Sequence, residues 1–414
     1  MATKYTKFDN EKRDQYTILV PSMLPIHFRL LKPIFKQSGY NIEVLTNDSD
    51  QVKEEGLAHV HNDTCYPALL VIGQFIDALK SGKYDLDHVA LVITQTAGGC
   101  RASNYLSLLR KALQMEGWEH IPCLSVNFSG LEKDSGLKIT MPMLLRVLYC
   151  VLYGDALMWL KNQVMPYELK PGQTEQVIDE IVSVLEQEFA GGGYRHSKKI
   201  YKMMIEKMKA IPRSQEPKIR VGIVGEIYMK YSPLGNHDLE NYLMREGFEP
   251  VVTGVMDFGL YCIENGIIDY EYYHRHAKTH SLFSLAKSLI MRMQKTFEQA
   301  VKKDGTFVPP EDFNQVIRDG KGFIDQGVKM GEGWLLTSEV VSLVKNGVNN
   351  IISAQPFGCL PNHIVAKGMV RRIKEVYPKA NIVAIDYDPS ASRVNQENRI
   401  RLMMANAKLN ADSE

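Results

Sequence analysis

The feature that most constrains the fold is a set of short runs that are apolar on both faces and alternate with segments of helical periodicity. Such runs are typical of strands in a parallel sheet that helices cover on both sides. We expect strands at 16–21, 41–46, 88–94, 121–127, 219–224, 249–253, 350–354 and 381–386. The sequence therefore predicts an α/β fold with two doubly wound parallel-sheet lobes, Rossmann-like or flavodoxin-like, that carry helical insertions.

The length of the chain and a change of pattern in its middle predict the domain organisation. A chain of 414 residues is longer than one hydrophobic core usually organises. Helical periodicity without strand runs extends over 141–208, and the polar segment 211–217 with its two prolines is typical of a linker. We expect an N-terminal α/β lobe at 1–135, a helical connector at 136–212 and a C-terminal α/β lobe with a helical insertion, near 274–300, at 213–414.

Composition and charge exclude several classes of protein. Apolar residues make up 45% and charged residues 23% of the chain, which excludes a disordered or collagen-like protein. The 49 Lys and Arg against 48 Asp and Glu leave no positive excess for nucleic acid or an acidic membrane surface. The polar N-terminus is not typical of a secretory signal, and Arg146, Gly154 and Asp155 interrupt the longest apolar stretch. We therefore expect a cytoplasmic protein that binds neither nucleic acid nor membrane.

Three of the six cysteines, Cys65, Cys100 and Cys359, lie in loops directly before predicted helices. A helix N-terminus lowers the pKa of a thiol, and thiolate is the ligand that soft metals and iron–sulfur clusters require. Gly99 and Gly358 precede two of these cysteines and would let backbone N–H groups approach an inorganic sulfide. The alternative is that all three are packed core residues, because free cysteine is often buried.

The remaining cysteines give weaker signals. Cys262 fits the core and the site equally well, Cys123 fits the core or the wall of a ligand cleft better, and Cys150 lies inside an apolar helix and fits packing. The chain has no C-x-x-C pair, so a mononuclear zinc site is not expected.

Two other residues are candidates for acid–base chemistry. Glu226 follows a predicted strand, and His363 lies four residues after Cys359. Either side chain could exchange a proton with a substrate. The alternatives are a solvated loop carboxylate for Glu226 and a helix-capping or surface role for His363. Asp155 lies in an apolar helix and needs a partner if it is buried.

Six segments together carry a resemblance to a known family. They are NDTCYPA at 62–68, TAGGCRASNY at 96–105, YGD at 153–155, VGEIYMKYSPLGN at 224–236, QPFGCLPNHIVAKGM at 355–369 and IDYDPSASRVNQENRI at 385–400. Taken together, they resemble the 2-hydroxyacyl-CoA dehydratase and benzoyl-CoA reductase superfamily, to which the double-cubane cluster proteins are related. The likeness spans the whole chain. It is greatest to the catalytic-like module of the large CoA-substrate-specific enzyme activases.

The resemblance implies a cofactor. In that family three cysteines, here Cys65, Cys100 and Cys359, hold a 4Fe-4S cluster in the cleft between the lobes, and its fourth iron stays open. The double-cubane members hold an 8Fe-9S cluster that needs more protein ligands. The six cysteines of this chain keep that alternative open, with Cys262 and Cys123 as further ligands.

The resemblance also implies an activity and a partner. A separate ATP-hydrolysing iron–sulfur activator would supply electrons for radical dehydration or for reduction of a small molecule, in an oxygen-sensitive protein. The chain has no G-x-x-x-x-G-K-[ST] loop, which agrees with ATP hydrolysis elsewhere. The substrate, an acyl-CoA or another small molecule, stays open, as does assembly into a homodimer or with a related subunit. The alternatives are a non-catalytic electron-relay or regulatory module and a cluster-free α/β binding protein.

Overall fold

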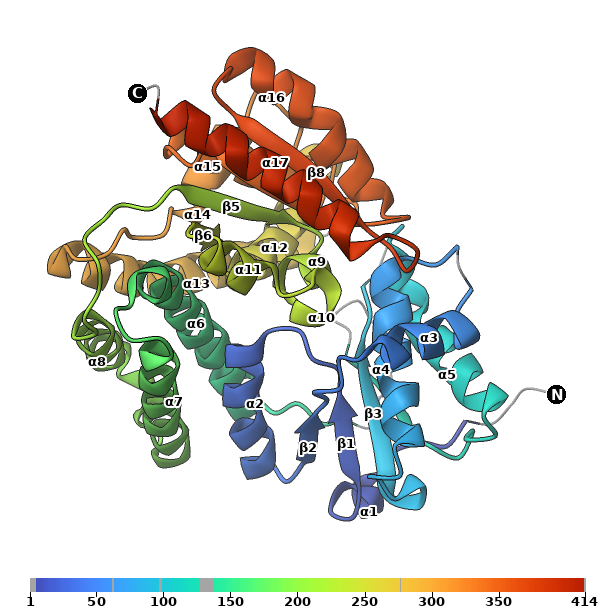
Figure 1. The fold of residues 1–414 in the computed structure, drawn as a ribbon. Helices are drawn as coiled ribbons and strands as arrows, with labels where there is room; N and C mark the ends of the chain where they lie inside the picture. The colour runs from blue at the N-terminus through green and yellow to red at the C-terminus, as the bar shows by residue number, and fades with distance from the viewer. Residues whose placement is uncertain (1–4, 62, 97–98, 127–136, 276, 413–414) are drawn as a thin grey trace.

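The computed structural model describes residues 5–412 apart from 62, 97–98, 127–136 and 276, and it contains two four-stranded parallel sheets (Figure 1). The first has the order β2-β1-β3-β4, from β1 (Thr17–Val20), β2 (Asn41–Val44), β3 (Val89–Thr94) and β4 (Cys123–Val126). The second has the order β6-β5-β7-β8, from β5 (Arg220–Gly225), β6 (Glu249–Val252), β7 (Asn350–Pro356) and β8 (Asn381–Tyr387). The predicted α/β fold with two parallel-sheet, Rossmann-like lobes is confirmed.

Both sheets follow the same path, which fixes where a ligand can bind. In each lobe the first strand is internal, so that Ile18 in β1 pairs with Ile42 in β2 on one side and Ala90 in β3 on the other. The chain reverses its direction across the sheet between β1 and β3, and again between β5 and β7. In open parallel sheets, ligands bind at the carboxyl ends of the strands beside such a reversal.

Helices cover the sheets of the two lobes. The N-terminal lobe has α1 (Asn10–Arg13), α2 (Pro25–Gln37), α3 (Asp50–His59), α4 (Tyr66–Lys80), α5 (Tyr105–Met115) and the 3-10 turns η1 (Leu86–His88) and η2 (Arg101–Asn104). The C-terminal lobe has α9 (Ile227–Tyr231), α10 (Pro233–Asn236), α11 (Leu239–Arg245), α12 (Val255–Tyr273), α13 (Ala277–Asp304), α14 (Phe313–Gly320), α15 (Trp334–Lys345), η5 (Asn362–Ala366), η6 (Lys367–Met369), α16 (Val370–Val376) and α17 (Arg393–Asp412).

The connector consists of α6 (Met141–Val164), η3 (Met165–Tyr167), α7 (Gln173–Gly191), η4 (Gly193–Arg195) and α8 (Ser197–Lys209). Helix α6 packs on α2 of one lobe and on β6 of the other (Figure 1). Met141–Tyr167 is long and apolar enough to cross a membrane by length and composition, but half of its most apolar window is buried inside the protein. The expected boundary at 135/136 lies outside the described residues.

Asp155 links three parts of the chain. Its Oδ1 lies 2.9 Å from His27 Nε2 in α2, and its two carboxylate oxygens accept hydrogen bonds of 2.9 Å each from the backbone N–H groups of Val255 and Met256 at the start of α12. A Cβ on Gly154 would lie 2.3 Å from the His27 ring, so only glycine fits there. The predicted ionic partner of Asp155 is confirmed. The YGD segment therefore joins the two lobes through α6.

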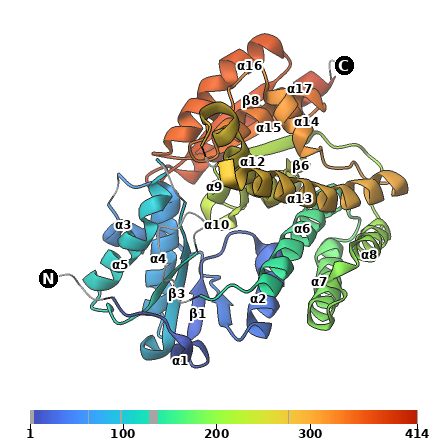
Figure 2. The same cartoon turned by 180° about the vertical axis from the view of Figure 1, so that it is seen from behind.

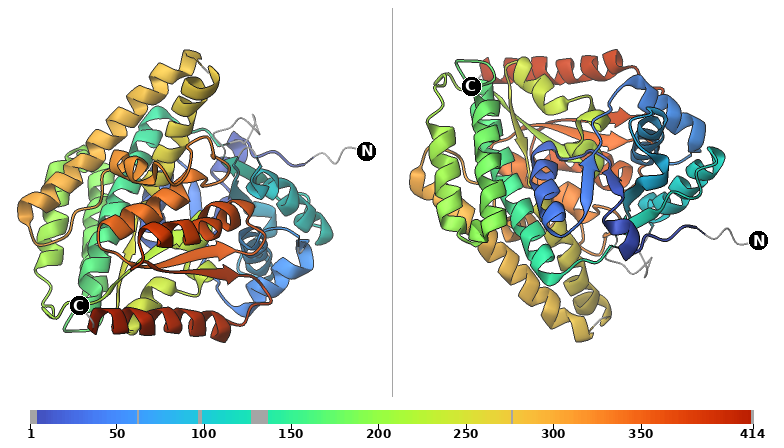
Figure 3. Two further views of the ribbon diagram at one scale, coloured as in Figure 1. Left: turned by 90° about the horizontal axis from the view of Figure 1, so that it is seen from above. Right: turned by 90° about the horizontal axis from the view of Figure 1, so that it is seen from below.

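Helix α13 matches the helical insertion expected near 274–300, and α12, which the sequence analysis did not identify, precedes it. The structure has two helices, α12 and α13, and the chain turns between them at His274, whose φ of 53° lies in the left-handed region. Helix α13 packs on α12 and also contacts α8 of the connector (Figure 2). Another helix that the sequence analysis did not identify, α17, lies against β8 (Figure 3).

Candidate functional site

Two of the three candidate cysteines follow equivalent strands of the two lobes. Cys100 lies after β3 and Cys359 after β7, and each of these strands stands at the point where its sheet reverses direction. Cys65 is the N-cap residue of α4, and Cys100 is the N-cap residue of η2, which leads into α5. The predicted position directly before a helix is therefore found for these cysteines, at strand-to-helix junctions for Cys100 and Cys359 and between α3 and α4 for Cys65. Residues 62 and 97–98 of the same motifs lie outside the described residues.

The structure brings the three cysteine segments together. A Cβ placed on Gly358 would lie 4.0 Å from the Cα of Cys65, so the turn before Cys359 packs on the start of α4. The thiols of Cys65 and Cys100 interact electrostatically, and Glu226 raises the pKa of both. Glu226 also raises the pKa of Cys359. The charge of one carboxyl group thus acts on three thiols that are far apart in the sequence.

The segment 328–333 joins the Cys100 loop to the Cys359 segment. A Cβ on Gly99 would lie 2.7 Å from Met330 Sδ, and a Cβ on Gly331 would lie 3.0 Å from Pro361 Cγ. Gly99 therefore packs closely against the flexible end of the Met330 side chain, a contact that differs from the predicted approach to a sulfide. The segment also carries Glu332, which is 8% exposed.

Glu226 and Glu332 form a pair of carboxyl groups beside the thiols. Glu226 accepts a hydrogen bond of 2.9 Å from Met229 N–H, and Glu332 accepts one of 3.1 Å from Ile227 N–H. Burial raises the pKa of both carboxyls, and repulsion from Glu332 raises the pKa of Glu226 further. A carboxyl that keeps its proton near neutral pH is suited to act as a general acid. Sequence analysis missed Glu332, although its place between two glycines just before α15 was a usable signal.

The thiols differ from the prediction in their protonation. Burial raises the pKa of Cys65 to about 11, and it also raises the pKa of Cys100 and Cys359. Hydrogen-bonding groups oppose this: Tyr105 Oη lies 3.0 Å from Cys65 Sγ, and Asn362 Nδ2 donates to Cys359 Sγ at 3.2 Å. The expectation that helix N-termini lower the pKa of these thiols is wrong, because loss of solvation outweighs them.

These surroundings fit a thiolate-bound cluster. Cys65 and Cys359 each have a hydrogen-bonding partner at the sulfur, the Tyr105 hydroxyl and the Asn362 amide, as second-shell groups do in cluster sites. A bound cation would offset the loss of solvation that keeps the thiols neutral, and its binding would release their protons. The donor set therefore matches iron–sulfur chemistry.

A second group of metal-ligating side chains lies in the N-terminal lobe. Ligand atoms of Glu55, His59 and Glu116 all lie within 4.8 Å of one another, the one such set among the described residues. Lys80 Nζ lies 2.8 Å from Glu55 Oε2 and 2.9 Å from Glu116 Oε1. Because the lysine ammonium already supplies the positive charge, this group is a buried ion-pair network. The cysteines do not form a set in which the ligand atoms lie this close together. A cubane does not require such closeness, because each thiolate binds a different iron.

The other predicted site residues lie in different places. Cys123 begins β4 at its amino end, whereas the three cysteine segments meet beyond the carboxyl ends, so its assignment as a further ligand is corrected. Cys150 is buried in the core as predicted, with Sγ 3.6 Å from the backbone oxygen of His27. Cys262 is an exposed residue of α12 whose thiol interacts electrostatically with Glu332.

His363 lies beside an acidic side chain. Its Nε2 lies 3.8 Å from Asp386 Oδ1, at the end of β8. Its Nδ1 is buried without a hydrogen-bond partner among the described residues, and the role of His363 as a proton donor stays a prediction.

Comparison with known proteins adds no family to this description. No family model matches the chain, and no curated protein matches it either. What defines the protein is its class: two Rossmann-like lobes that place three cysteines and two carboxyl groups at one site beside the points where their sheets reverse.

Proposed function

We propose that the protein binds an iron–sulfur cluster between its lobes through Cys65, Cys100 and Cys359 and carries out low-potential reductive chemistry. Electrons would come from a separate ATP-hydrolysing iron–sulfur activator. The observation that supports this best is that the turn before Cys359 packs on Cys65, while Cys100 interacts electrostatically with Cys65 and the charge of Glu226 acts on all three thiols. A cluster bound there supplies a one-electron redox centre. We propose a cytoplasmic, oxygen-sensitive protein of the 2-hydroxyacyl-CoA dehydratase type.

The number of nearby thiols favours a single 4Fe-4S cluster with one open iron. Cys65, Cys100 and Cys359 would supply three thiolates, which is the number such a cluster needs. An 8Fe-9S double cubane needs more ligands, but Cys123 lies at the far end of its strand and Cys150 lies in the core. Cys262 interacts electrostatically with Glu332 and is the nearest further candidate.

Glu226 is the residue to which we assign proton delivery. Loss of a hydroxyl group as water requires a proton, and reduction of a small molecule consumes protons together with electrons. The side chain of Glu226 is partly open to solvent, and its raised pKa keeps the proton available. Glu332 lies behind it, more deeply buried, and its charge makes ionisation of Glu226 less favourable. The substrate is an acyl-CoA or another small molecule.

The second candidate function is a non-catalytic electron-relay or regulatory module, which would need the thiols but no proton donor. Glu226→Gln separates the two. Glutamine can still accept the hydrogen bond from Met229 N–H, but it holds no acidic proton. If the protein is catalytic, the Glu226→Gln variant should keep its cluster but lose turnover in an assay in which a strong chemical reductant replaces the activator. Unchanged turnover of every reducible substrate would favour the relay.

The cluster itself is tested by anaerobic reconstitution with iron and sulfide. We expect about four irons per chain and a visible charge-transfer band. Cys65→Ser, Cys100→Ser and Cys359→Ser should each lower the iron content strongly, whereas the matched control Cys150→Ser should keep it. A colourless protein, or loss of iron in Cys150→Ser equal to that in the other three variants, would refute the proposal.

A further inference from the structure

A cavity of about 240 Å³ lies between α6, the edge strand β6 and α15. Its walls are largely apolar and include Trp159, Pro250, Val251, Val308 and Leu343. An apolar cavity of about 150 Å³ is large enough to hold benzene, so this one has room for a ring and a short polar tail. None of the cysteines lines it.

Asn162 is the unusual side chain in this wall. It is 3% exposed, and neither its Nδ2 nor its Oδ1 has a hydrogen-bond partner among the residues that the structure describes. A buried amide without partners costs about 1–3 kcal/mol, and leucine at this position of an apolar helix would avoid that cost. The next residue, Gln163, is fully paired with Val308, at 3.1 Å through Nε2 and 2.8 Å through Oε1. The unused donor and acceptor of Asn162 thus line the cavity.

The same cavity is acidic. Its charged lining residues are Arg220 and the four acids Glu249, Asp257, Glu311 and Glu339. Glu339 has a cationic partner, because Lys230 Nζ lies 3.0 Å from its Oε1. Asp257 has only a neutral donor, Gln294 Nε2 at 3.0 Å, and no ion pair with any described residue. A positive charge in the cavity would supply what Asp257 lacks.

We propose that this cavity binds a small aryl amine that also carries a hydrogen-bond acceptor, such as an amino alcohol. The ring fills the space beside Trp159 and Leu343, the ammonium group pairs with Asp257, and the amide of Asn162 takes the remaining polar group. An amine ligand suits the excess of acids in the wall. This site is separate from the proposed cluster, and its ligand does not depend on that proposal.

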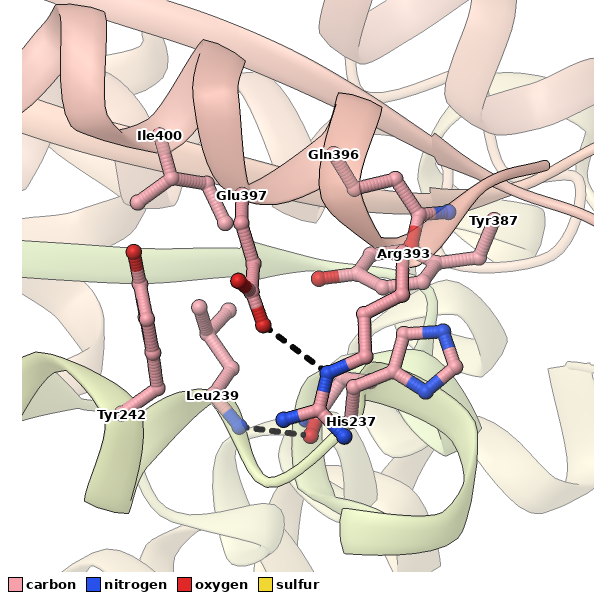
Figure 4. A pocket seen from close by; sticks show the side chains of 9 residues that line it. His237, Leu239, Tyr242, Tyr387, Arg393, Gln396, Glu397 and Ile400 are labelled. Carbon is pink, nitrogen blue, oxygen red and sulfur yellow. Dashed lines mark hydrogen bonds and ion pairs between the residues drawn. The ribbon is translucent and has the colours of Figure 1, made fainter.

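Another hollow on the described surface lacks these features. It lies beside α17 and has a volume of about 10 Å³, which leaves room for about one water. Figure 4 shows Arg393 lying between Glu397 and His237 there. Arg393 Nε is already paired with Glu397 Oε1 at 2.8 Å. Arg393 therefore provides a control position for substitutions outside the cavity.

Titration calorimetry with a charge series tests the proposal. At pH 8, phenylalaninol should bind at least tenfold more tightly than 3-phenylpropan-1-ol, which lacks the amine, and 3-phenylpropionate should not bind. Asp257→Asn should reduce the affinity for phenylalaninol to that for the alcohol. Asn162→Leu should weaken phenylalaninol binding at least tenfold while raising the thermal unfolding midpoint. Arg393→Ala, at the other hollow, should change neither quantity.

Three results would overturn the proposal: no binding of phenylalaninol at millimolar concentration, equal affinity for all three compounds, or unchanged affinity in Asn162→Leu. Any of them would mean that the cavity does not recognise an amine through Asp257 and Asn162. The Cys65→Ser variant tests the amine site independently of the proposed cluster. Its affinity for phenylalaninol should equal that of the unaltered chain, so the amine site and the iron site can fail separately.

Discussion

Replacing Asp155 by asparagine should destabilise the protein by about 2–4 kcal/mol, because one carboxylate supports contacts to two helices. Its oxygens accept from Val255 N–H and Met256 N–H and pair with His27 Nε2, each at 2.9 Å. Asparagine keeps one acceptor oxygen and turns an amide NH₂ toward the second backbone N–H, so that group loses its partner. A loss of this size is a large share of a total stability of roughly 5–15 kcal/mol.

Urea denaturation followed by far-UV circular dichroism and by tryptophan fluorescence measures the effect. The three tryptophans report on different parts, since Trp118, Trp159 and Trp334 lie in the N-terminal lobe, the connector and the C-terminal lobe. The matched control is Asp312→Asn, because Asp312 caps only its own helix, accepting from Asn314 N–H at 2.9 Å, and asparagine caps equally well. Equal midpoints for the two variants would refute the role assigned to Asp155 as the link between lobes.

Three further predictions concern the site and the cavity. Gly358→Ala and the control Gly322→Ala both place a side chain at positive φ, 79° and 89°, so each should lower the free energy of unfolding by about 1 kcal/mol. Only Gly358→Ala should also lower the iron content after reconstitution. Lys230→Met leaves Glu339 buried without its ionic partner and should lower the free energy of unfolding by about 3–5 kcal/mol, as measured by urea denaturation. The double variant Lys230→Met with Glu339→Leu should recover most of this loss, and no recovery would contradict the prediction. Burial raises the pKa of Asp257 to about 7, above its unfolded value, so the contribution of this carboxyl to stability is lost as the pH rises toward 7. The urea midpoints of the unaltered chain at pH 5 and pH 8 should therefore differ more than those of Asp257→Asn. An equal difference in both proteins would contradict the assignment.

The strands were predictable because the sheets are buried on both faces, and each strand of the structure overlaps an apolar run in the sequence. Helix α3 was not predictable, because the face that it packs on α4 is largely polar. Its buried residues are Val52, Glu55, Gly56 and His59. Glu55 and His59 are paired there with Lys80 and Glu116, so their burial depends on partners far along the chain. Periodicity of apolar residues cannot identify such a face.

The candidate site was predictable where local sequence determines it and not where tertiary packing does. Turn glycines and an approaching helix marked Cys100 and Cys359. The approach of segment 328–333 to both loops depends on the packing of Met330 on Gly99 and of Gly331 on Pro361, which no local pattern reveals. The raised thiol pKa values also depend on how deeply the lobes bury the site, which the sequence does not state.

The shared topology of the two lobes explains why Glu332 belongs to the site. Cys65 precedes α4, the helix directly before β3, and Glu332 precedes α15, the helix directly before β7. Since Cys100 and Cys359 also follow equivalent strands, the lobes present four corresponding positions: two thiols from one lobe, and one thiol and one carboxyl from the other. Substituting cysteine at the fourth position therefore provides a test. Glu332→Cys should bind at least as much iron as the unaltered chain but lose turnover, because a fourth thiolate would close the open iron; lower iron content would contradict the correspondence.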